Sequence, residues 1–570
     1  MDRFDVLVKD ATIVDGSGGP AYRGSLGVRG ERVTAIGAVS GIAGTVIDGA
    51  ELVVSPGFID PHSHGDVSIL KYPLAESKIM QGITTFVGGN CGMSLAPVRG
   101  RAAHEYVTRW FDVDITWETF GGFLDTVQAT GTSVNVVPLV GHNAIRTTVL
   151  GTDFKRRAID SEITRMQAHV HEAMQSGAFG FTTGLDASPG EYADLTEIVP
   201  LAEVAGQADG LYATHVRHNQ TQWPADSQEE YAYGLFHGPI EDVWVGRYRG
   251  YQEAIEVGRR ARLPVQISHL AYAYVIPQPH PDFLAAAVAR ATVAEFVDRP
   301  RREGLRVTFD TIFSPSGIAS PAPLVTAFKQ ALAHYGKAVL VEKLRSPEFR
   351  QELKDAYDSG KLKLGMLHPK ADPFWADCFE LLVFRNQARQ GKTVAVLLAE
   401  IGGHPVDLLA DLILEDPDAV WAQTRDKKRT PPGLAAFLEH PLCMPCTDAF
   451  IHPAAPPAGD PTPPPIAYGN YAAYLDTYVK QQAVLSLEEA IHRATGLVAE
   501  TFGLKDRGIL QPGAYADIVI LDLETIGMRG DALHPDQPPE GIDTVLVNGQ
   551  VVYRNKAHTG AQPGKVLRKQ

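Results

Sequence analysis

Residues 57–66, "GFIDPHSHGD", place two histidines one residue apart directly after a short apolar run. In a β-strand the side chains at i and i+2 point to the same face, so His62 and His64 would converge on one point. Two ligands of one metal ion must do the same. Two exposed loop histidines would give the same letters, so the motif needs support from the rest of the chain.

Seven further apolar runs follow this motif, and each is succeeded by a helix-like stretch. They are "TTFVGGN" (84–90), "VNVVPLVGHN" (134–143), "FGFTTGL" (179–185), "LYATHVRH" (211–218), "PVQISHL" (264–270), "RVTFDTIF" (306–313) and "LCMPCTDAF" (442–450). Eight apolar runs that alternate with helices predict an α/β fold, a (β/α)8 TIM-like barrel of parallel strands. Such barrels carry their chemistry at the carboxyl ends of their strands.

The predicted strand ends do carry metal-binding residue types. The first run leads to His62 and His64. The ends of five later runs carry Cys91 (second run), His142 (third run), His215 (fifth run), His269 (sixth run) and Asp448 (eighth run). Histidines are only 19 of 570 residues, so this placement is hard to attribute to chance. Imidazole and thiolate together favour zinc over magnesium or calcium. A carboxylate such as Asp448 beside the zinc can move the protons of a hydrolysis.

At the two ends of the chain, strand-like runs occur without the helix-like stretches that follow them in the predicted barrel. Residues 1–56 and 507–570 contain short strand-like runs between glycine-rich turns, and "VLVNGQVVY" (545–553) has the Asn-Gly of a tight hairpin. Neither end alone has enough strands for a good core. We therefore predict one small β-sandwich built from both ends, with the barrel at 57–506. Two separate β modules would be the simpler arrangement.

Two long excursions interrupt the predicted barrel. Residues 228–251 hold six aromatic side chains in 24 residues, which predicts a lid over the site, with a subunit contact as the alternative. Residues 314–373, after the seventh strand, contain the helical patterns "PLVTAFKQALAHYG" and "PEFRQELKDAYDSG". These patterns predict an inserted subdomain.

Composition narrows the class of protein. The net charge of −15 disfavours a nucleic-acid surface, and no apolar run approaches the length of a membrane span. The start lacks the features of a signal peptide, and four cysteines in 570 residues do not form a disulfide framework. We predict a cytoplasmic protein with a small-molecule partner and without nucleic-acid or membrane partners. Homo-oligomerisation is left open.

Several motifs together make the chain recognisable. "GFIDPHSHGD", "GGNCG" (88–92), "THVR" (214–217), "ISHL" (267–270) and "PGAYADIVILD" (512–522) occur in this order along the chain. Together they resemble the metal-dependent amidohydrolase superfamily, and most closely its N-acyl-D-amino-acid deacylase (D-aminoacylase) branch. The resemblance spans nearly the whole chain. It implies a (β/α)8 barrel with a small β-domain from both termini.

The resemblance also implies a ligand set. Cys91, His215 and His269 would hold a tightly bound Zn²⁺, while His62, His64 and Asp448 would line a second, weaker metal position. Asp448 would be the general acid and base. Many relatives bridge two metals with a carboxylated lysine after the fourth strand, but "FGFTTGLDASPG" (179–190) has no lysine. This departure argues against the hydantoinase and dihydroorotase branches.

Three further residues have two interpretations each. His142 either helps to polarise the scissile carbonyl or braces a neighbour. Tyr192 matches a family tyrosine near the substrate, but it could also pack at a helix start. Arg217 lies two residues after His215 on the same strand, so it would face the same mouth, or it forms a buried structural ion pair.

The substrate is where the chain departs from the branch that it resembles. That branch grips a free α-carboxylate with a lysine, a tyrosine and an arginine, whereas this chain has Ala271 and Phe313 at the first two positions and no arginine shortly after Asp448. A desolvated carboxylate without a charged partner costs several kcal/mol. We therefore predict a zinc-dependent hydrolase of a non-peptide amide that is larger, less charged or aromatic. Arg217 or Arg146 could compensate, which would leave a true N-acyl-D-amino-acid deacylase. The same motifs would also suit a lactone or carbamate hydrolase, or a catalytically silent relative of the family.

Overall fold

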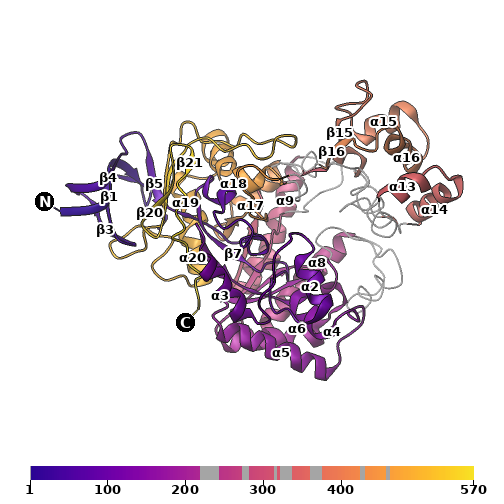
Figure 1. The fold of residues 1–570 in the computed structure, drawn as a ribbon, viewed down its shortest axis with the longest axis horizontal. Helices are drawn as coiled ribbons and strands as arrows, with labels where there is room; N and C mark the ends of the chain where they lie inside the picture. Colours follow the sequence, from indigo (N-terminus) through magenta and orange to yellow (C-terminus); the bar gives the residue numbers. More distant parts are fainter. Residues whose placement is uncertain are drawn as a thin grey trace.

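The two ends of the chain meet in one nine-stranded sheet. The computed structural model describes residues 2–217, 243–271, 282–313, 318–320, 337–359, 362, 375–423, 431–457 and 463–569. The strands of this sheet are β1 (Asp2–Ile13), β2 (Tyr22–Arg29), β3 (Arg32–Gly37), β4 (Gly41–Asp48), β5 (Val53–Pro56), β18 (Ile518–Leu521), β19 (Ile542–Val547), β20 (Gln550–Arg554) and β21 (Ala557–His558). β5 and β18 pair antiparallel, so strands from both ends of the chain share one sheet. Figure 1 shows them together at one end of the molecule.

The predicted Asn-Gly hairpin lies between β19 and β20, which pair antiparallel. Asn548 and Gly549 have φ values of 44° and 79°. Positive φ at both central residues is what a tight hairpin turn needs, and asparagine followed by glycine tolerates it best.

Two parallel sheets form the centre of the molecule. Their strands are β6 (Phe58–Asp60), β7 (Ile83–Gly88) and β8 (Asn135–Pro138) in the first, and β9 (Val140–Gly141), β10 (Gly180–Gly184), β11 (Leu211–His215), β12 (Val265–Ile267), β13 (Val307–Thr311) and β17 (Cys443–Pro445) in the second. Each of the eight predicted apolar runs overlaps one of these nine strands, except the third run, which contains both β8 and β9. Nearly all of their residues are buried, as expected for parallel strands that are covered on both faces.

Helices connect the parallel strands and cover them. They are α1 (Glu76–Ile79), α2 (Gly100–Thr108), α3 (Phe120–Thr130), α4 (His142–Leu150), α5 (Asp160–Gln175), α6 (Leu195–Gln207), α8 (Val243–Ala261), α9 (Asp282–Val293), α10 (Arg299–Arg302), α17 (Pro431–Leu438), α18 (Ile466–Tyr474), α19 (Leu487–Ala494) and α20 (Gly496–Phe502). Local sequence fixes where several begin: Ser486 and Glu489 form a capping box at α19, for example. None of the described helices is long and apolar enough to cross a membrane.

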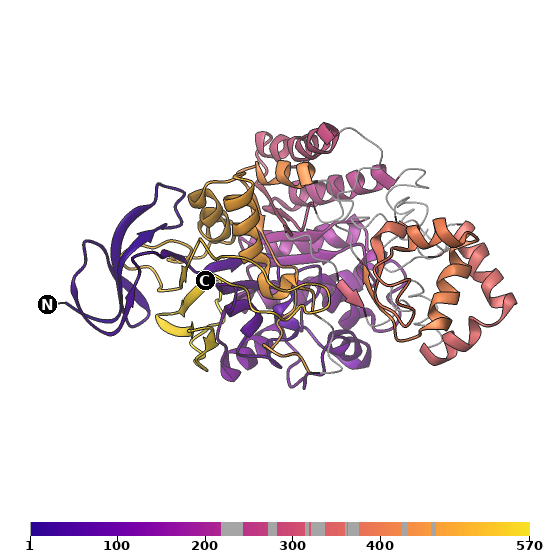
Figure 2. The ribbon, with the colours of Figure 1, turned by 90° about the horizontal axis from the view of Figure 1, so that it is seen from above.

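A second hydrophobic core lies between residues 340 and 421. It is built from α13 (Lys337–Lys343), α14 (Pro347–Asp358), α15 (Val394–Ile401) and α16 (Pro405–Glu415), together with β15 (Phe379–Val383) and β16 (Val420–Gln423). The short β14 (Ile318–Ser320) also pairs with β16. Figures 1 and 2 place this unit at the end of the molecule opposite to the sheet of the termini.

The two predicted excursions differ from the structure in extent. The second core reaches to Trp421, well past residue 373, because α15 and α16 supply apolar faces that α14 alone lacks. Of the predicted lid, residues 228–242 lie outside the described residues, as does "PLVTAFKQALAHYG". Residues 243–251 are not loop but the first part of α8, and Tyr251 is buried against Phe296.

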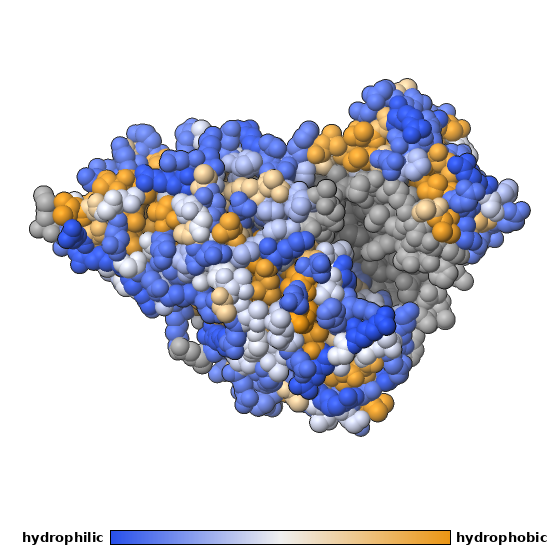
Figure 3. All heavy atoms as spheres, viewed as in Figure 1, coloured by the Kyte–Doolittle hydropathy of each residue, from blue (hydrophilic) through white to orange (hydrophobic). Residues whose placement is uncertain are grey.

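Apolar side chains outside these cores are scattered. The face seen in Figure 3 is mostly hydrophilic, with small apolar areas between. Small apolar areas are ordinary on the surface of a globular protein, and they mark no site by themselves.

Candidate metal centre

Six of the predicted site residues converge at the carboxyl ends of the parallel strands. His62 and His64 follow β6, Cys91 follows β7, His215 ends β11, His269 follows β12, and Asp448 follows β17. Their ligand atoms form two groups, His62–His64–Cys91–Asp448 and Cys91–His215–His269, and within each group all atoms lie within 4.8 Å of one another. Cys91 belongs to both groups.

The distances within the cluster are short. Cys91 Sγ lies 3.2 Å from His62 Nε2 and 3.6 Å from both His215 Nδ1 and His269 Nε2. Asp448 Oδ1 lies 3.0 Å from His64 Nε2 and 3.3 Å from His62 Nε2. One sulfur, one carboxylate and four imidazoles therefore share a space that one or two metal ions would fill.

Three cluster residues have strained backbones. The φ values of Cys91, Asp448 and His269 are 52°, 49° and 35°, in the left-handed region that non-glycine residues rarely adopt. Hydrogen bonds hold two of them: the Asp448 N–H donates to His62 O (2.9 Å), and the His269 N–H donates to Asp310 Oδ1 (2.7 Å). Strain of this kind persists where the surroundings enforce it and is concentrated at functional sites.

The charges of the cluster suit a metal ion. Burial by itself raises the pKa of the Cys91 thiol, but His62 and hydrogen bonds with His215 and His269 hold it well below its usual value. Burial likewise raises the pKa of Asp448. The charge of His62 and hydrogen bonds with His62 and His64 have the larger effect, so the pKa of Asp448 lies well below its usual value. Thiolate and carboxylate are the forms in which these side chains bind metal ions, so the donor set fits zinc.

Two carboxylates that the sequence analysis missed orient the histidines. Asp310, on β13, lies 3.3 Å from His62 Nδ1, and Asp186, after β10, lies 3.5 Å from His215 Nε2. A carboxylate behind a metal-binding imidazole fixes its orientation and raises its basicity. The sequence did contain a signal for Asp310, because "VTFDTIF" places a carboxylate inside a buried apolar run.

A buried lysine ties the first and last parallel strands together. Lys78 Nζ donates to Asp60 Oδ2 (2.9 Å) and to Thr447 Oγ1 (2.6 Å), and the Thr447 N–H donates to Asp60 Oδ1 (3.0 Å). All three side chains are fully buried. Because Asp60 lies two residues before His62 and Thr447 directly precedes Asp448, this clamp fixes the spacing between the two halves of the cluster.

His142 contacts a buried carboxylate, that of Glu197. It begins α4, it is fully buried, and its Nε2 lies 2.7 Å from Glu197 Oε1. Arg146 pairs with the same carboxylate. Burial raises the pKa of Glu197, but His142 and Arg146 together lower it to about 2, so the carboxylate stays charged. These contacts favour the bracing interpretation of His142.

Tyr192 ends the short helix η2 (Gly190–Tyr192), just before α6. Its side chain is buried, with the ring 6.2 Å from Phe154. Asp194, two residues later, accepts a hydrogen bond from the Thr196 N–H and caps α6, as the predicted helix start requires. A substrate contact of Tyr192 stays a prediction.

Arg217 forms the buried ion pair that the sequence allowed as its second interpretation. Its Nε and Nη2 lie 3.0 and 3.1 Å from the two carboxylate oxygens of Glu253, on α8. Nη1 and Nη2 also donate to the backbone carbonyls of Glu191 and Ala193 (2.8 and 2.7 Å). The guanidinium thus secures the 191–193 turn, and these contacts favour the structural interpretation of Arg217.

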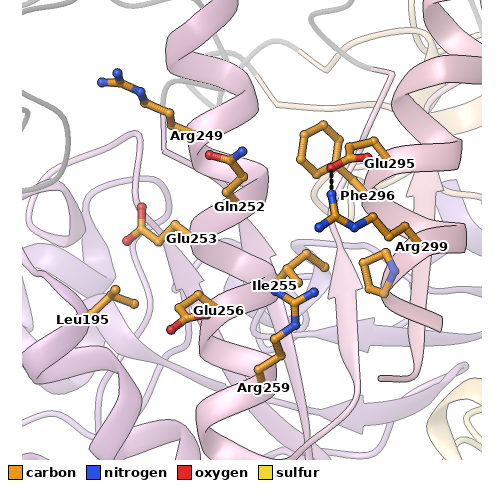
Figure 4. Close-up of a pocket in the computed structure, with 11 residues that line it drawn as sticks. Leu195, Arg249, Gln252, Glu253, Ile255, Glu256, Arg259, Glu295, Phe296 and Arg299 are labelled. Atoms are coloured by element: carbon orange, nitrogen blue, oxygen red, sulfur yellow. Dashed lines mark hydrogen bonds and ion pairs between the residues drawn. The ribbon is translucent and has the colours of Figure 1, made fainter. Parts of the chain in front are cut away.

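A groove of about 630 Å³ lies outside the cluster, between α6, α8 and the π-helix η3 (Ala294–Asp298). Figure 4 shows its acidic and basic side chains interleaved, with Arg299 paired to Glu295. Arg259 pairs with Glu303 close by. Two of the cations that line the groove are thus paired, and among the described residues the groups that could hold a metal ion lie in the cluster instead.

Comparisons with known proteins agree with this geometry. The model of the amidohydrolase family matches residues 45–293 and 459–553. The chain is 30% identical to D-aminoacylase of Alcaligenes xylosoxydans xylosoxydans, over 99% of this chain and 97% of the relative, and 30% identical to N-acyl-D-aspartate deacylase of the same organism, over 99% and 95%. A crystal structure of N-acyl-D-glutamate deacylase from Bordetella bronchiseptica, complexed with zinc and a phosphonate mimic of the tetrahedral intermediate, superposes with a TM-score of 0.70 at 27% identity, covering 100% of both chains.

Proposed function

The chain belongs to the amidohydrolase family, and from this premise we propose that its six-residue cluster binds zinc and hydrolyses a linear amide. It is an enzyme that acts on carbon–nitrogen bonds other than peptide bonds. The observation that carries the metal assignment is the convergence of Cys91 with four histidines and Asp448.

The architecture behind this site is a closed (β/α)8 barrel. β8 and β9 are separated by one residue, which joins the two parallel sheets, and the Asp448 N–H bond to His62 O links the last strand to the first. The barrel occupies residues 57–506, and residues 1–56 and 507–570 form the β-sandwich. The inserted unit, predicted at 314–373, has its described core between residues 340 and 421.

The cluster divides into two metal positions. Cys91, His215 and His269 would hold a tightly bound zinc, and His62, His64 and Asp448 would line a weaker second position; both sets lie within the two groups of donor atoms. Cys91 is shared because its sulfur reaches both groups. When bound here, zinc acidifies a water molecule and polarises an amide carbonyl.

Asp448 moves the protons of the reaction. Its carboxylate is ionised and positioned by two histidines, so it accepts a proton from the attacking water and returns it to the departing nitrogen. The Lys78 clamp keeps this carboxylate at a fixed distance from His62. Asp310 and Asp186 keep the imidazoles in the orientation that ligation needs.

Replacing Asp310 by asparagine is expected to weaken zinc binding by about 10- to 100-fold, because His62 loses the carboxylate that orients it and the His269 backbone loses a charged acceptor. Competition with a zinc chelator measures the change. Glu253→Gln is the matched control, since it removes another fully buried carboxylate from an ion pair outside the cluster. Equal zinc affinity in Asp310→Asn and wild type would contradict the orienting role.

The substrate is less charged than an N-acyl-D-amino acid. Ala271 is buried and carries no charge, and the ring of Phe313 packs 5.5 Å from those of Tyr474 and Tyr478. Two arginines could in principle bind a substrate carboxylate, but both are held in buried ion pairs: Arg146 with Glu197 and Arg217 with Glu253. An amide without a free carboxylate therefore fits better. A true N-acyl-D-amino-acid deacylase and a lactone or carbamate hydrolase are the rival functions.

N-Acetyl-D-phenylalanine and its carboxamide separate these functions, because they differ only in the charge next to the amide. We expect the carboxamide to have a kcat/KM about tenfold higher or more, since no described cation at the positions above offsets the desolvation of a carboxylate. A higher kcat/KM for the acid would restore ordinary deacylase specificity. Hydrolysis of lactones or carbamates alone would support the other rival, and no turnover of any substrate would indicate a silent relative.

A further inference from the structure

We infer that the side chains of Tyr106, Trp110 and Phe450, here called the aromatic wall, bind an aromatic ring attached to the scissile amide. This inference rests on the proposed function and names the substrate class of that same site. The wall is built by the end of α2 and the loop after Asp448, so both of its parts lie within the described residues.

Phe450 connects the wall to the metal cluster. It lies two residues after Asp448, and its ring centroid is 5.9 Å from that of His64. The His64 side chain is 11% exposed and that of Asp448 is 16% exposed, so both side chains keep some contact with solvent. A substrate whose amide reaches Asp448 therefore passes close to Phe450.

Trp110 extends the wall outward. Its ring is 5.7 Å from Phe450, and the residue is 44% exposed. Phe111 supports Phe450 from behind, with the two rings edge to face at 5.2 Å, and is itself buried. An exposed indole held against a second ring beside a hydrolytic centre offers an apolar face to which an aromatic ring can pack.

Arg109 fixes the orientation of the wall. Its guanidinium lies 3.6 Å from the centre of the Tyr106 ring and 5.8 Å from that of Trp110. A cation stacked on aromatic faces restrains both rings without covering their other sides. The wall is therefore formed before a substrate arrives.

The inner end of the wall carries polar groups. The Tyr106 hydroxyl and the Asn143 carbonyl oxygen are both buried at this end and lie within reach of each other. Asn143 is next to the cluster: its backbone N–H donates to Gly92 O (3.0 Å), and its side-chain oxygen lies 3.0 Å from where a Cβ on Gly92 would be. Burial raises the pKa of Tyr106, and the charge of Cys91 raises it further. The charge of Arg109 and a hydrogen bond with Asn143 act in the opposite direction.

A buried hydroxyl and a buried carbonyl oxygen that meet each other can also bind a ligand that offers both an acceptor and a donor. The Tyr106 hydroxyl can donate to an acceptor and the Asn143 oxygen can accept from an N–H. An amide group offers both. The wall thus combines an apolar face for a ring with polar groups for the bond to which the ring is attached.

The test is Trp110→Ala in the full zinc-loaded chain, measured on two matched pairs of amides. N-Phenylacetylglycinamide against N-acetylglycinamide places the ring on the acyl side, and N-benzylacetamide against N-ethylacetamide places it on the amine side. In wild type we expect the aromatic member of at least one pair to have a kcat/KM about tenfold above its aliphatic partner. Trp110→Ala should remove that advantage while leaving the aliphatic member within about twofold.

Tyr22→Ala is the control, because Tyr22 is an exposed aromatic residue on β2 in the sheet of the termini. It should change neither ratio. The pair in which the preference disappears shows which side of the amide meets the wall. If wild type turns over aromatic and aliphatic members equally, or if the preference survives in Trp110→Ala, the wall is overturned while the proposed function stands. If wild type hydrolyses none of the four amides, nor the carboxamide above, both fall.

Discussion

Replacing Cys91 by alanine is expected to remove most of the bound zinc and nearly all activity. The Cys91 sulfur is shared by both groups of donor atoms, and its loss leaves only His215 and His269 in the smaller group. Loss of an orienting partner alone costs 10- to 100-fold in metal affinity or activity, so loss of a ligand should cost activity at least on the order of 10²-fold. Elemental analysis of the purified protein, expected to give about one tightly bound zinc per chain in wild type, measures the first effect.

Two companion variants sharpen this experiment. Cys443→Ala removes the same atoms from β17, where burial raises the pKa of the thiol well above its usual value, and it should keep the zinc. Cys91→Gly should lose the same zinc as Cys91→Ala, but it relieves the left-handed backbone at this position. Full zinc content in either Cys91 variant would refute the ligand assignment.

Asp448→Asn is expected to leave the fold and the tight zinc in place while it lowers turnover by on the order of 10²–10⁴. The amide keeps the shape of the side chain but cannot accept the proton of the attacking water. Asparagine also tolerates the left-handed φ of 49° at this position better than most residues, so the backbone should not change. Steady-state kinetics at saturating substrate, with zinc content measured on the same sample, isolates the proton-transfer role.

Asp506→Asn is the matched control for this variant. Asp506 has a φ of 58°, like Asp448, but pairs with Arg32 near the surface. Turnover should be unchanged. Near-normal turnover in Asp448→Asn would assign the proton transfer elsewhere, with His64 the first residue to test because its Nε2 lies 3.0 Å from the same carboxylate.

The sequence indicated the strand ends and the residues that lie together there, for a physical reason. A buried parallel strand is apolar along its whole length, so a histidine, cysteine or aspartate at its end stands out against its neighbours. His62, Cys91, His215 and Asp448 were found in this way, and the structure brings them together. The joining of β5 to β18 was predictable because neither end of the chain had strands enough for a core.

Roles that depend on distant partners could not be predicted. Arg217 lies two residues after His215, which ends β11, and it pairs with Glu253 on α8, a partner that depends on how that helix packs. The orienting role of Asp186 and the Lys78 clamp likewise depend on side chains far apart in sequence. The length of the second core was underestimated because α15 and α16 follow a stretch without a clear pattern, and only their packing against α14 shows that they belong to it.

The pairing of β5 with β18 has a consequence for the order in which the protein can fold as it is synthesised. Pro56 lies opposite Ile518, so more than 400 residues must leave the ribosome before β5 gains its second neighbour. At 5–20 residues per second, this delay lasts roughly 20–90 s. During that time the β5 edge is unpaired beside an apolar face, which is the kind of edge that attracts other strands. Molecular chaperones that shield nascent chains would therefore be needed first at the N-terminal strands and released only when the last tenth of the chain has emerged.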